Sequence, residues 1–231
     1  MVLVTLACML AGEAKAASAS PDDPLEPLNR AVLNLNLLAF DWALAPAASV
    51  YRSATPEPVR RSVGNFLQNL RAPMVFANDV LQGKTDRAGT TLSRFAINST
   101  IGLFGLFDPA SKYGYTPHHE DLGKTLATYG VPAGPYLMLP LLGPSNVRDA
   151  VARVGDYLTL NLYLIDTGTV LGANTLSDTE ATMDHLRAMR ASSLDFYALL
   201  RSTHQQLRKA EIADGIPAAD QEYEAIFAAD P

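Results

Sequence analysis

The chain has 231 residues, of which 48% are hydrophobic and only 18% are charged, below the roughly 25% that is typical of soluble domains. Its formal net charge of -6 does not suggest a nucleic-acid partner, because such a partner requires a basic face. The single cysteine, Cys8, excludes an internal disulfide framework and a cysteine-rich zinc site.

The N-terminus has the pattern of a secretory signal. Residues 2–11 are apolar and residues 14–16 (AKA) fit a small-residue cleavage site, which predicts a signal peptide over residues 1–16 and a tether over residues 17–22. A positive n-region is missing, so either the true start lies upstream or the signal is atypical. Cys8 loosely resembles the cysteine of a bacterial lipidation box, although Thr5 stands where an aliphatic residue is expected. The alternative is an unmodified cysteine in a discarded signal.

The first predicted helix begins near Asp23, which can cap it, and continues through residues 29–44. This segment is apolar nearly all round, which is typical of a helix that is deeply buried or in contact with lipid. Its polar residues come in pairs seven apart, so each pair lies along one stripe: Asn29 with Asn36, and Asn34 with Asp41. The stripes either satisfy polar partners in a core, which the pattern alone favours, or face a water-containing passage.

The middle of the chain also predicts helices. A helix beginning at residues 55–56 is expected to break at Pro73, and a short helix over residues 74–82 is expected to stop at Gly83. Asp86 is expected to cap a further helix that ends near residue 102. Residues 101–107 (IGLFGLF) then place large apolar side chains on a glycine-containing backbone.

The C-terminal third continues the helical pattern. Ser145 is expected to cap a helix that runs to about residue 164, and residues 177–180 (SDTE) form a capping box for a long helix that stops at Gly215. Residues 216–231 are expected to be a mobile tail. No convincing strand alternation occurs, so the sequence predicts an all-α domain over residues 23–215, with a possible short hairpin near Tyr129–Leu139.

Residues 125–147 carry no charged side chain. Their length would suffice to cross a bilayer, for which about 20 apolar residues are enough. Repeated prolines and glycines, however, exclude one smooth transmembrane helix. The segment is therefore expected to be covered by protein, embedded in lipid, or lining something apolar.

The sequence offers little sign of catalytic chemistry. Residues 118–121 (HHED) are the only dense cluster of potential ligands, and their spacing is not that of zinc proteases. A solvated loop leading into a helix is preferred over a metal site. No nucleophile elbow, phosphate-binding loop or dinucleotide fingerprint occurs. We therefore expect neither an enzyme nor a bound cofactor.

Several blocks in a fixed order give the chain a family resemblance. They are residues 23–30 (DPLEPLNR), 63–70 (VGNFLQNL), 78–84 (NDVLQGK), 94–100 (RFAINST), 102–108 (GLFGLFD), 120–126 (EDLGKTL), 134–140 (GPYLMLP), 143–145 (GPS), 148–149 (RD) and, more weakly, 193–197 (SLDFY) with Arg201. In these blocks the chain resembles the MlaA (VacJ) family of Gram-negative outer-membrane lipoproteins. The resemblance spans residues 23 to about 201.

The resemblance implies a ring of amphipathic helices lying in the inner leaflet of the outer membrane, with apolar loops rich in glycine and proline. It implies a partly polar channel through which phospholipid head groups pass towards the periplasm, and so maintain lipid asymmetry without chemistry on the lipid. The implied partners are phospholipid, a trimeric porin and a periplasmic lipid-carrier protein.

On this basis the passage is expected to be lined by residues of the first helix and of the two interrupted loops: Asn34, Asn36, Asp41, Phe104, Phe107 and Tyr136. Backbone broken by proline and glycine is tolerated at membrane depth where it lines a cavity. The competing interpretations are a soluble periplasmic carrier of an apolar ligand and a porin-associated structural protein.

Overall fold

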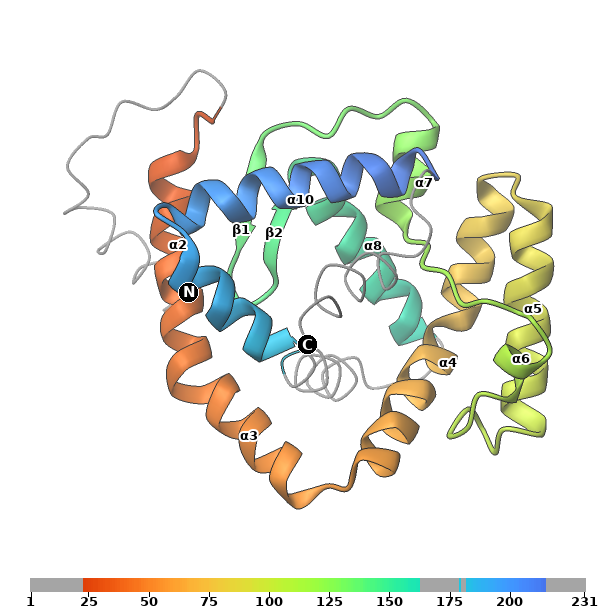
Figure 1. The fold of residues 1–231 in the computed structure, drawn as a ribbon. Helices are drawn as coiled ribbons and strands as arrows, with labels where there is room; N and C mark the ends of the chain where they lie inside the picture. The colour runs from red at the N-terminus through yellow and green to blue at the C-terminus, as the bar shows by residue number, and fades with distance from the viewer. Residues whose placement is uncertain (1–22, 163–178, 180–181, 215–231) are drawn as a thin grey trace.

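The computed structural model describes residues 23–162, 179 and 182–214. Its helices form a ring, as Figure 1 shows, with a two-stranded hairpin on the inner side. The all-α prediction and the ring arrangement are therefore confirmed. The predicted signal peptide, tether and C-terminal tail, together with Cys8 and most of the 177–180 capping box, lie outside the described residues.

The first side of the ring is one helical rod made of α2 (Glu26–Ala39), the π-helical turn η1 (Phe40–Leu44) and α3 (Ala45–Ala54). In the π turn, the Ala45 amide donates to the Phe40 carbonyl, five residues back. The next residue, Pro46, has no amide hydrogen and would clash with the carbonyl four residues before it in a regular α-helix. The wider turn relieves that clash, so the rod continues past the proline.

The second side is α4 (Glu57–Leu81), which pairs with α5 (Thr85–Thr100). Gly83, at φ +73°, turns the chain between them, as predicted. The predicted break at Pro73 is wrong, because α4 continues through it. An internal proline costs a helix about 3 kcal/mol, and packing along α5 offsets that cost. Asp86 lies in the first turn of α5 without a side-chain capping bond.

The chain then returns to the ring through α6 (Pro109–Lys112), α7 (Leu122–Thr128) and the hairpin of β1 (Tyr136–Leu139) and β2 (Gly143–Asn146). The strands are antiparallel, with Tyr136 opposite Asn146. The predicted hairpin is thus confirmed, shifted towards the C-terminus. Helix α8 (Val147–Leu162) follows directly. Asn146 accepts a bond from the Asp149 amide at 2.9 Å and so takes the capping role predicted for Ser145, which lies in β2.

The last part of the ring is a helix over residues 182–192 followed by α10 (Phe196–Ile212). One long helix was predicted here, and that prediction is wrong. The chain breaks at residues 193–195, and the Asp195 side chain caps α10 by accepting from the Ala198 amide at 3.1 Å. The break lets residues 182–192 run beside α2 inside the ring while α10 crosses it (Figure 1).

Two asparagines join α2 to the hairpin. The Asn29 side chain donates to the Tyr136 carbonyl at 3.0 Å and accepts from the Met138 amide at 2.8 Å. Seven residues on, Asn36 donates to the Leu139 carbonyl at 2.9 Å and accepts from the Leu141 amide at 2.8 Å. Each side-chain carboxamide donates one hydrogen bond and accepts another, as the backbone of a neighbouring strand would. Helix α2 therefore lies along β1 in the place of a third strand. This confirms that the stripe formed by these two residues satisfies polar partners.

The ring closes where its first and last helices meet. Asp23 is fully buried and accepts a hydrogen bond from the Tyr197 hydroxyl, and Arg201 lies 3.5 Å from it. Arg30 forms two bonds to Asp195, at 2.6 and 3.0 Å, and stacks 4.5 Å above the Tyr197 ring. Beside these contacts lies a small apolar core of Val32, Leu33, Tyr136, Met138 and Tyr197. We call this junction the clasp.

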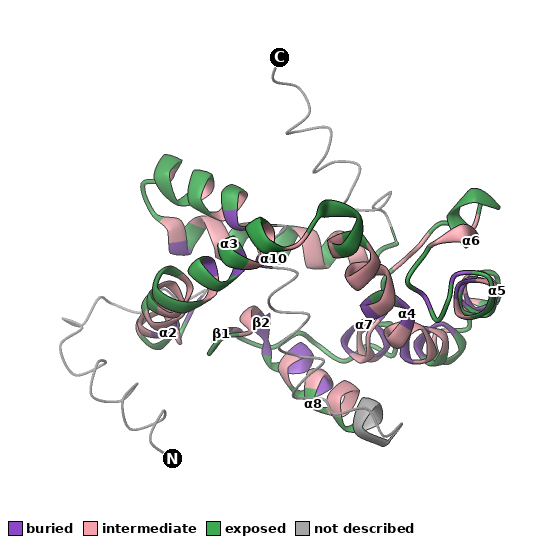
Figure 2. Cartoon of the chain, turned by 90° about the horizontal axis from the view of Figure 1, so that it is seen from below, coloured by how far each residue is buried: buried purple, intermediate pink, exposed green. Residues whose placement is uncertain are grey.

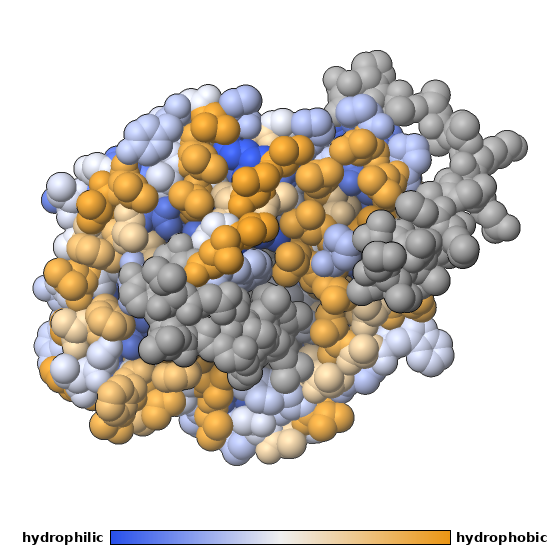
Figure 3. Space-filling view, turned by 180° about the vertical axis from the view of Figure 1, so that it is seen from behind, coloured by the Kyte–Doolittle hydropathy of each residue, from blue (hydrophilic) through white to orange (hydrophobic). Residues whose placement is uncertain are grey.

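The outer surface of the ring is strongly apolar. Large exposed side chains occur around it, including Trp42 at 80% and Phe104 at 77% exposure. Figure 2 shows exposed positions along much of α3, and Figure 3 shows hydrophobic side chains over much of one face. The rod Glu26–Ala54 is long and apolar enough to cross a membrane by length and composition, with 22% of its most apolar window buried. Burial inside the protein therefore does not account for its apolar character.

Candidate functional site

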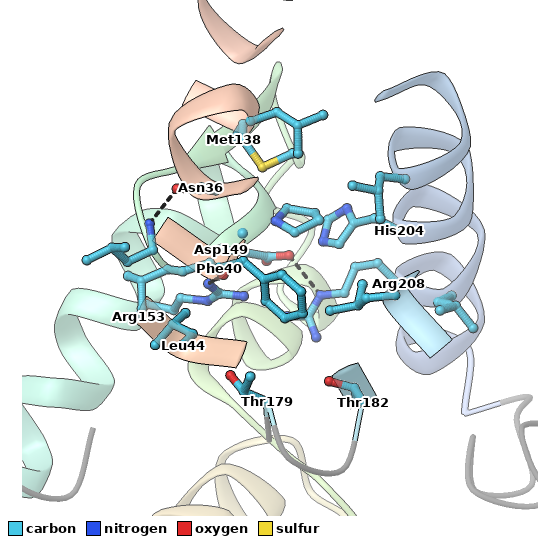
Figure 4. Close-up of a pocket in the computed structure, with 18 of the residues that line it drawn as sticks. Asn36, Phe40, Leu44, Met138, Asp149, Arg153, Thr179, Thr182, His204 and Arg208 are labelled. Atoms are coloured by element: carbon cyan, nitrogen blue, oxygen red, sulfur yellow. Dashed lines mark hydrogen bonds and ion pairs between the residues drawn. The ribbon is translucent and has the colours of Figure 1, made fainter. Parts of the chain in front are cut away.

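A cavity of about 680 Å³ lies inside the ring. Its walls come from the first rod, α4, the loop before α7, the hairpin, α8, residues 182–192 and α10. Figure 4 shows side chains from several of these elements directed into it. The cavity exists because the helices close a circle, so no single element contains the site.

One wall of the cavity is apolar. Leu33, Leu37, Phe40 and Leu44 face it from the first rod, at spacings of four, three and four residues, which place them on one helical face. The hairpin and the C-terminal helices add Met138, Leu141, Leu142, Leu186, Phe196, Leu200 and Leu207. This wall suits hydrocarbon.

The other wall is polar and is organised by Arg208 of α10. Its guanidinium bonds to Asp121 at 2.7 and 2.8 Å, to Asp149 at 2.7 Å and to Glu211 at 2.9 Å. Asp121 is the N-cap of α7, accepting from the Lys124 amide at 2.8 Å, and Asp149 lies in the first turn of α8. We call this set the Arg208 network. It fixes three helices around the polar wall.

Electrostatics keeps the acids of this network ionised. Burial raises the pKa of Asp121, but the hydrogen bond and charge of Arg208 outweigh it and hold the pKa at about 2. The same competition, burial against Arg208 and Arg148, leaves the pKa of Asp149 below its usual value. These carboxylates are therefore already neutralised by arginine and have little charge to offer a ligand.

Gly123 shows how tightly this wall is packed. A Cβ atom at Gly123 would lie 2.5 Å from Asp149 Oδ1 and 2.7 Å from Arg208 Nη2. The glycine therefore lets the first turn of α7 approach the ion pairs. The volume that a side chain at this position would need is occupied by Asp149 and Arg208 of the network.

In the part of the chain that the structure describes, five further charged groups line the cavity outside the network. Arg187 and Arg190 form salt bridges, to Asp184 at 3.8 Å and to Asp41 at 2.8 Å. The other three are Arg71 of α4, and Arg153 and Asp156 of α8. Arg153 donates to the Leu142 carbonyl at 3.2 Å, and Asp156 accepts from the Leu122 amide at 3.4 Å. Burial raises the pKa of Asp156 to about 6. Within the described residues, no salt bridge joins any of the three to an opposite charge.

The histidines of the cavity are held neutral near pH 7. His119 lines the cavity between α4 and α7, and 61% of its side chain is accessible. Burial among the surrounding residues lowers its pKa, and the nearby Arg71 charge lowers it further. Burial likewise lowers the pKa of His204. The positive charges of the cavity are therefore arginines.

The predicted passage residues are not brought together. Asn36 lines the cavity. Asn34 is exposed on the other side of α2, and Asp41 is partly exposed and pairs at 2.8 Å with Arg190, which does line the cavity. Tyr136 is 5% exposed in the apolar core beside the cavity, where burial raises its pKa to about 12.

The two predicted phenylalanines lie away from the cavity. Phe104 and Phe107 are exposed in the turn after α5, outside the ring. Leu103 and Phe104 both have positive φ, and Asn69 of α4 donates to the Phe104 carbonyl at 3.3 Å. This backbone turns the apolar side chains outward, which fits a surface that meets lipid or protein.

The HHED segment is a loop that leads into α7, as predicted, but it is only partly solvated, with His119 exposed and its neighbours largely buried. Glu120 is fully buried, and Lys84, Arg87 and Lys124 lie 3.2, 2.8 and 3.0 Å from it. His118 lies 3.0 Å from the buried Asp79. Within the described residues, no group of three or more His, Cys, Asp or Glu side chains is placed to hold a metal ion.

Sequence reasoning missed the charged residues of the cavity. A usable signal was present in α8, where Asp149, Arg153 and Asp156 recur at helical spacing on a helix that is otherwise apolar on that side. Arg71 and Arg208 gave no such signal, because their place in the site depends on elements far away in the sequence.

Comparisons with known proteins agree with this architecture. The family model described as MlaA lipoprotein matches residues 21–211. The intermembrane phospholipid transport system lipoprotein MlaA of Shigella flexneri is 33% identical over 200 residues, covering 84% of this chain and 79% of its own. An uncharacterised protein of Rickettsia bellii is 33% identical over 195 residues, covering 82% of this chain and 76% of its own.

A solved structure has the same fold. It comes from a study of the structural basis for maintenance of bacterial outer membrane lipid asymmetry. It matches with a TM-score of 0.75 at 28% identity, covering 82% of this chain and 98% of its own. The fold and the site define a ring-shaped helical protein with an amphipathic central cavity. The chain belongs to the MlaA lipoprotein family.

Proposed function

We propose that this protein is the outer-membrane component of an intermembrane phospholipid transport system. It takes mislocalised phospholipid from the outer leaflet and passes it through the central cavity towards the periplasm, which maintains lipid asymmetry. The observation that carries the proposal is the cavity itself, which is lined by both apolar side chains and arginines, inside a ring with an apolar exterior.

The two walls match the two parts of a phospholipid. The leucines and Phe40 of the first rod provide a surface for acyl chains, and burial of apolar surface stabilises such contact by about 25 cal/mol per Å². Arginine binds phosphate through a planar fork of donors. An exterior rich in apolar side chains lets interfacial helices lie in a membrane without spanning it.

The proposed location is the periplasmic side of the outer membrane, with a trimeric porin and a periplasmic lipid-carrier protein as partners. The family resemblance supports both partners, and the exposed apolar side chains supply surface for them. Lipidation at Cys8 remains a prediction. No chemistry on the lipid is proposed.

The test is an outer-leaflet phospholipid assay in a strain that lacks this gene. Wild-type protein should restore low surface phospholipid. Thr182→Trp, which places an indole at the cavity wall, should fail to restore it, whereas Thr100→Trp, at an exposed position outside the cavity lining, should restore it. Both variants are compared at equal membrane abundance.

Unchanged surface phospholipid in the deletion strain would contradict the transport function. A soluble carrier is the second candidate, favoured by the apolar side chains that line a cavity of about 680 Å³. That candidate predicts protein that stays monodisperse without detergent and does not copurify with porin. Phospholipid hydrolysis by the pure protein would indicate an enzyme instead.

A further inference from the structure

The polar wall of the cavity contains two kinds of charge. Arg208 is saturated by three carboxylates, and Arg190 is paired with Asp41. Arg71, Arg153 and Asp156 are different, because within the described part of the chain none of them forms a salt bridge. A cavity that only needed structural support would not require uncompensated charges on its wall.

The three groups share one side of the cavity. Arg153 and Asp156 are three residues apart on α8, so they lie on the same helical face. Arg71 comes from α4, which packs against α8, and the Arg71 charge acts on His119 in the same wall. Figure 4 shows Arg153 directed into the cavity, and its guanidinium bonds to the carbonyl of Leu142, one of the apolar lining residues, at 3.2 Å. Two cations and one anion thus share the cavity with side chains that suit hydrocarbon.

Leaving charges unpaired in such surroundings is unfavourable. A charge moved out of water loses solvation that only an opposite charge or good hydrogen bonds restore. The effect is visible at Asp156, where burial raises the pKa to about 6 while the nearby Asp121 opposes ionisation and Arg153 and Arg208 favour it. A ligand that brings the opposite charges to the same places would relieve this cost.

The required ligand has an anion and a cation a short distance apart. A phosphodiester satisfies guanidinium groups through charge-assisted hydrogen bonds. A primary ammonium satisfies a carboxylate in the same way. Ethanolamine phospholipids carry both groups in one head, next to acyl chains that suit the apolar lining of the cavity. A glycerol head group carries the phosphate but leaves the carboxylate unpaired.

We propose that Arg71 and Arg153 bind the phosphodiester, and Asp156 binds the ammonium, of a zwitterionic phospholipid head group. The inference rests on the proposed function, since it requires phospholipid to enter this cavity. It adds a selectivity: the site favours phosphatidylethanolamine over the anionic phosphatidylglycerol. Asp156 is the residue that discriminates, because both lipids offer the same phosphate to the arginines.

The test uses the purified full chain in detergent with an equimolar mixture of dioleoyl-phosphatidylethanolamine and dioleoyl-phosphatidylglycerol. Retained lipid is counted by mass spectrometry. Wild type should retain the ethanolamine lipid in excess. Asp156→Asn should bring the ratio close to one while total lipid is kept. The double variant Arg71→Gln, Arg153→Gln should lower retention of both lipids by roughly tenfold, the loss expected for charge-assisted bonds.

The controls are Glu57→Gln and Arg61→Gln, which remove the same charges from an exposed ion pair outside the cavity lining. Both should behave as wild type. A competition arm adds soluble glycerophosphoethanolamine, which has the head group without acyl chains. Displacement of lipid by an equal concentration of this compound would assign the site to a soluble ligand and overturn the proposal.

The remaining outcomes distinguish failure of the head-group selectivity from failure of the transport function. An unchanged lipid ratio in Asp156→Asn, with lipid still bound by wild type, would overturn the head-group selectivity and leave transport intact. Absence of any retained phospholipid from wild type would count against the proposed function itself, and the selectivity would fall with it.

Discussion

Replacing glycine by alanine adds one methyl group, and its expected effect on stability has opposite signs at Gly123 and at Gly89. At Gly123, a Cβ atom would overlap Asp149 and Arg208 of the Arg208 network. At Gly89, in the second turn of α5, nothing lies within 4 Å of the same atom. The difference lies in the surroundings, because both residues are helical.

Gly123→Ala should destabilise the protein, and Gly89→Ala should stabilise it. The first displaces buried ion pairs, at a cost of roughly 2 to 4 kcal/mol. The second reduces the backbone freedom of the unfolded chain, which adds about 0.5 to 1 kcal/mol. Urea unfolding in detergent measures both. Equal effects of the two substitutions would show that the Arg208 network can move aside to admit a methyl group at residue 123.

Asp156 predicts a pH-dependent change in stability. Its folded pKa of about 6 lies above the ordinary 3.8, so the folded state holds its proton longer than the unfolded state does. Stability from this group is therefore complete below about pH 4 and is lost as the pH rises through 6. Asp156→Asn should match wild type at pH 4 and exceed it by roughly 1 to 2 kcal/mol at pH 7.5, after allowance for solvent screening.

The measurement is thermal or urea unfolding of both proteins across this pH range. The difference in unfolding free energy between the two proteins removes the pH dependence that comes from the acids they share, including Asp121 and Asp149. A constant difference at all pH values would mean that the carboxylate ionises normally, and would weaken the argument that it lacks a cation.

At the scale of elements, the junction of α2 with β1 depends on side chains that imitate backbone. Asn29 is 1% exposed and satisfies both a carbonyl and an amide of β1. Asn34 lies on the same helix but is exposed. Alanine substitutions at Asn29 and Asn34 have the same effect on helix propensity, because both residues are asparagines in α2. A difference in their effect on stability therefore measures the burial and hydrogen bonding of Asn29.

Asn29→Ala should cost roughly 2 to 4 kcal/mol, since it leaves two buried backbone groups of β1 unpaired. Asn34→Ala should stay within about 0.5 kcal/mol of wild type. Amide hydrogen exchange of residues 136–139 gives a second readout, because faster exchange should appear in the first variant alone. Protection that is unchanged in Asn29→Ala would show that β2 alone holds the strand.

Most of the helices were predictable from the sequence. The helix boundaries that differ from the prediction have physical causes. Apolar periodicity indicated the helices, and Gly83 marked its turn correctly. Pro73 did not end α4, because tertiary packing overrides local preference. Residues 193–195 interrupt a segment with continuous helical pattern because Asp195 caps a new helix and pairs with Arg30, a partner 165 residues away.

The site was less predictable than the fold. Of the six predicted passage residues, the structure places Asn36 on the cavity wall. The asparagine stripes were visible in the sequence, but which stripe faces inward depends on where the hairpin lies. Arg71, Arg153 and Arg208 come from three helices that meet only after the ring closes. No local pattern contains that information.

At the scale of the whole molecule, the apolar exterior gives the protein a built-in reporter. The chain has one tryptophan, Trp42, and it is 80% exposed on the outer side of the rod. An exposed indole in water emits at long wavelength, whereas one in a lipid environment does not. If the ring lies in a membrane interface, this residue reports contact with lipid.

Adding phospholipid vesicles or micelles should shift the Trp42 emission to shorter wavelength, and brominated acyl chains should quench it. Trp42→Phe provides the blank, and flotation with the vesicles shows that the protein has bound. Flotation without a spectral shift would place this part of the ring away from the bilayer.

The clasp has a consequence for the order in which the molecule is made. Its contacts join Asp23 to Tyr197, 174 residues apart, and Arg30 to Asp195. Ribosomes add about 5 to 20 residues each second, so roughly 8 to 35 seconds separate the synthesis of the two halves. During that interval the inner face of α2 lacks the helix that finally covers it. The helix that begins at Glu26 is thus among the first segments made and among the last to be completed.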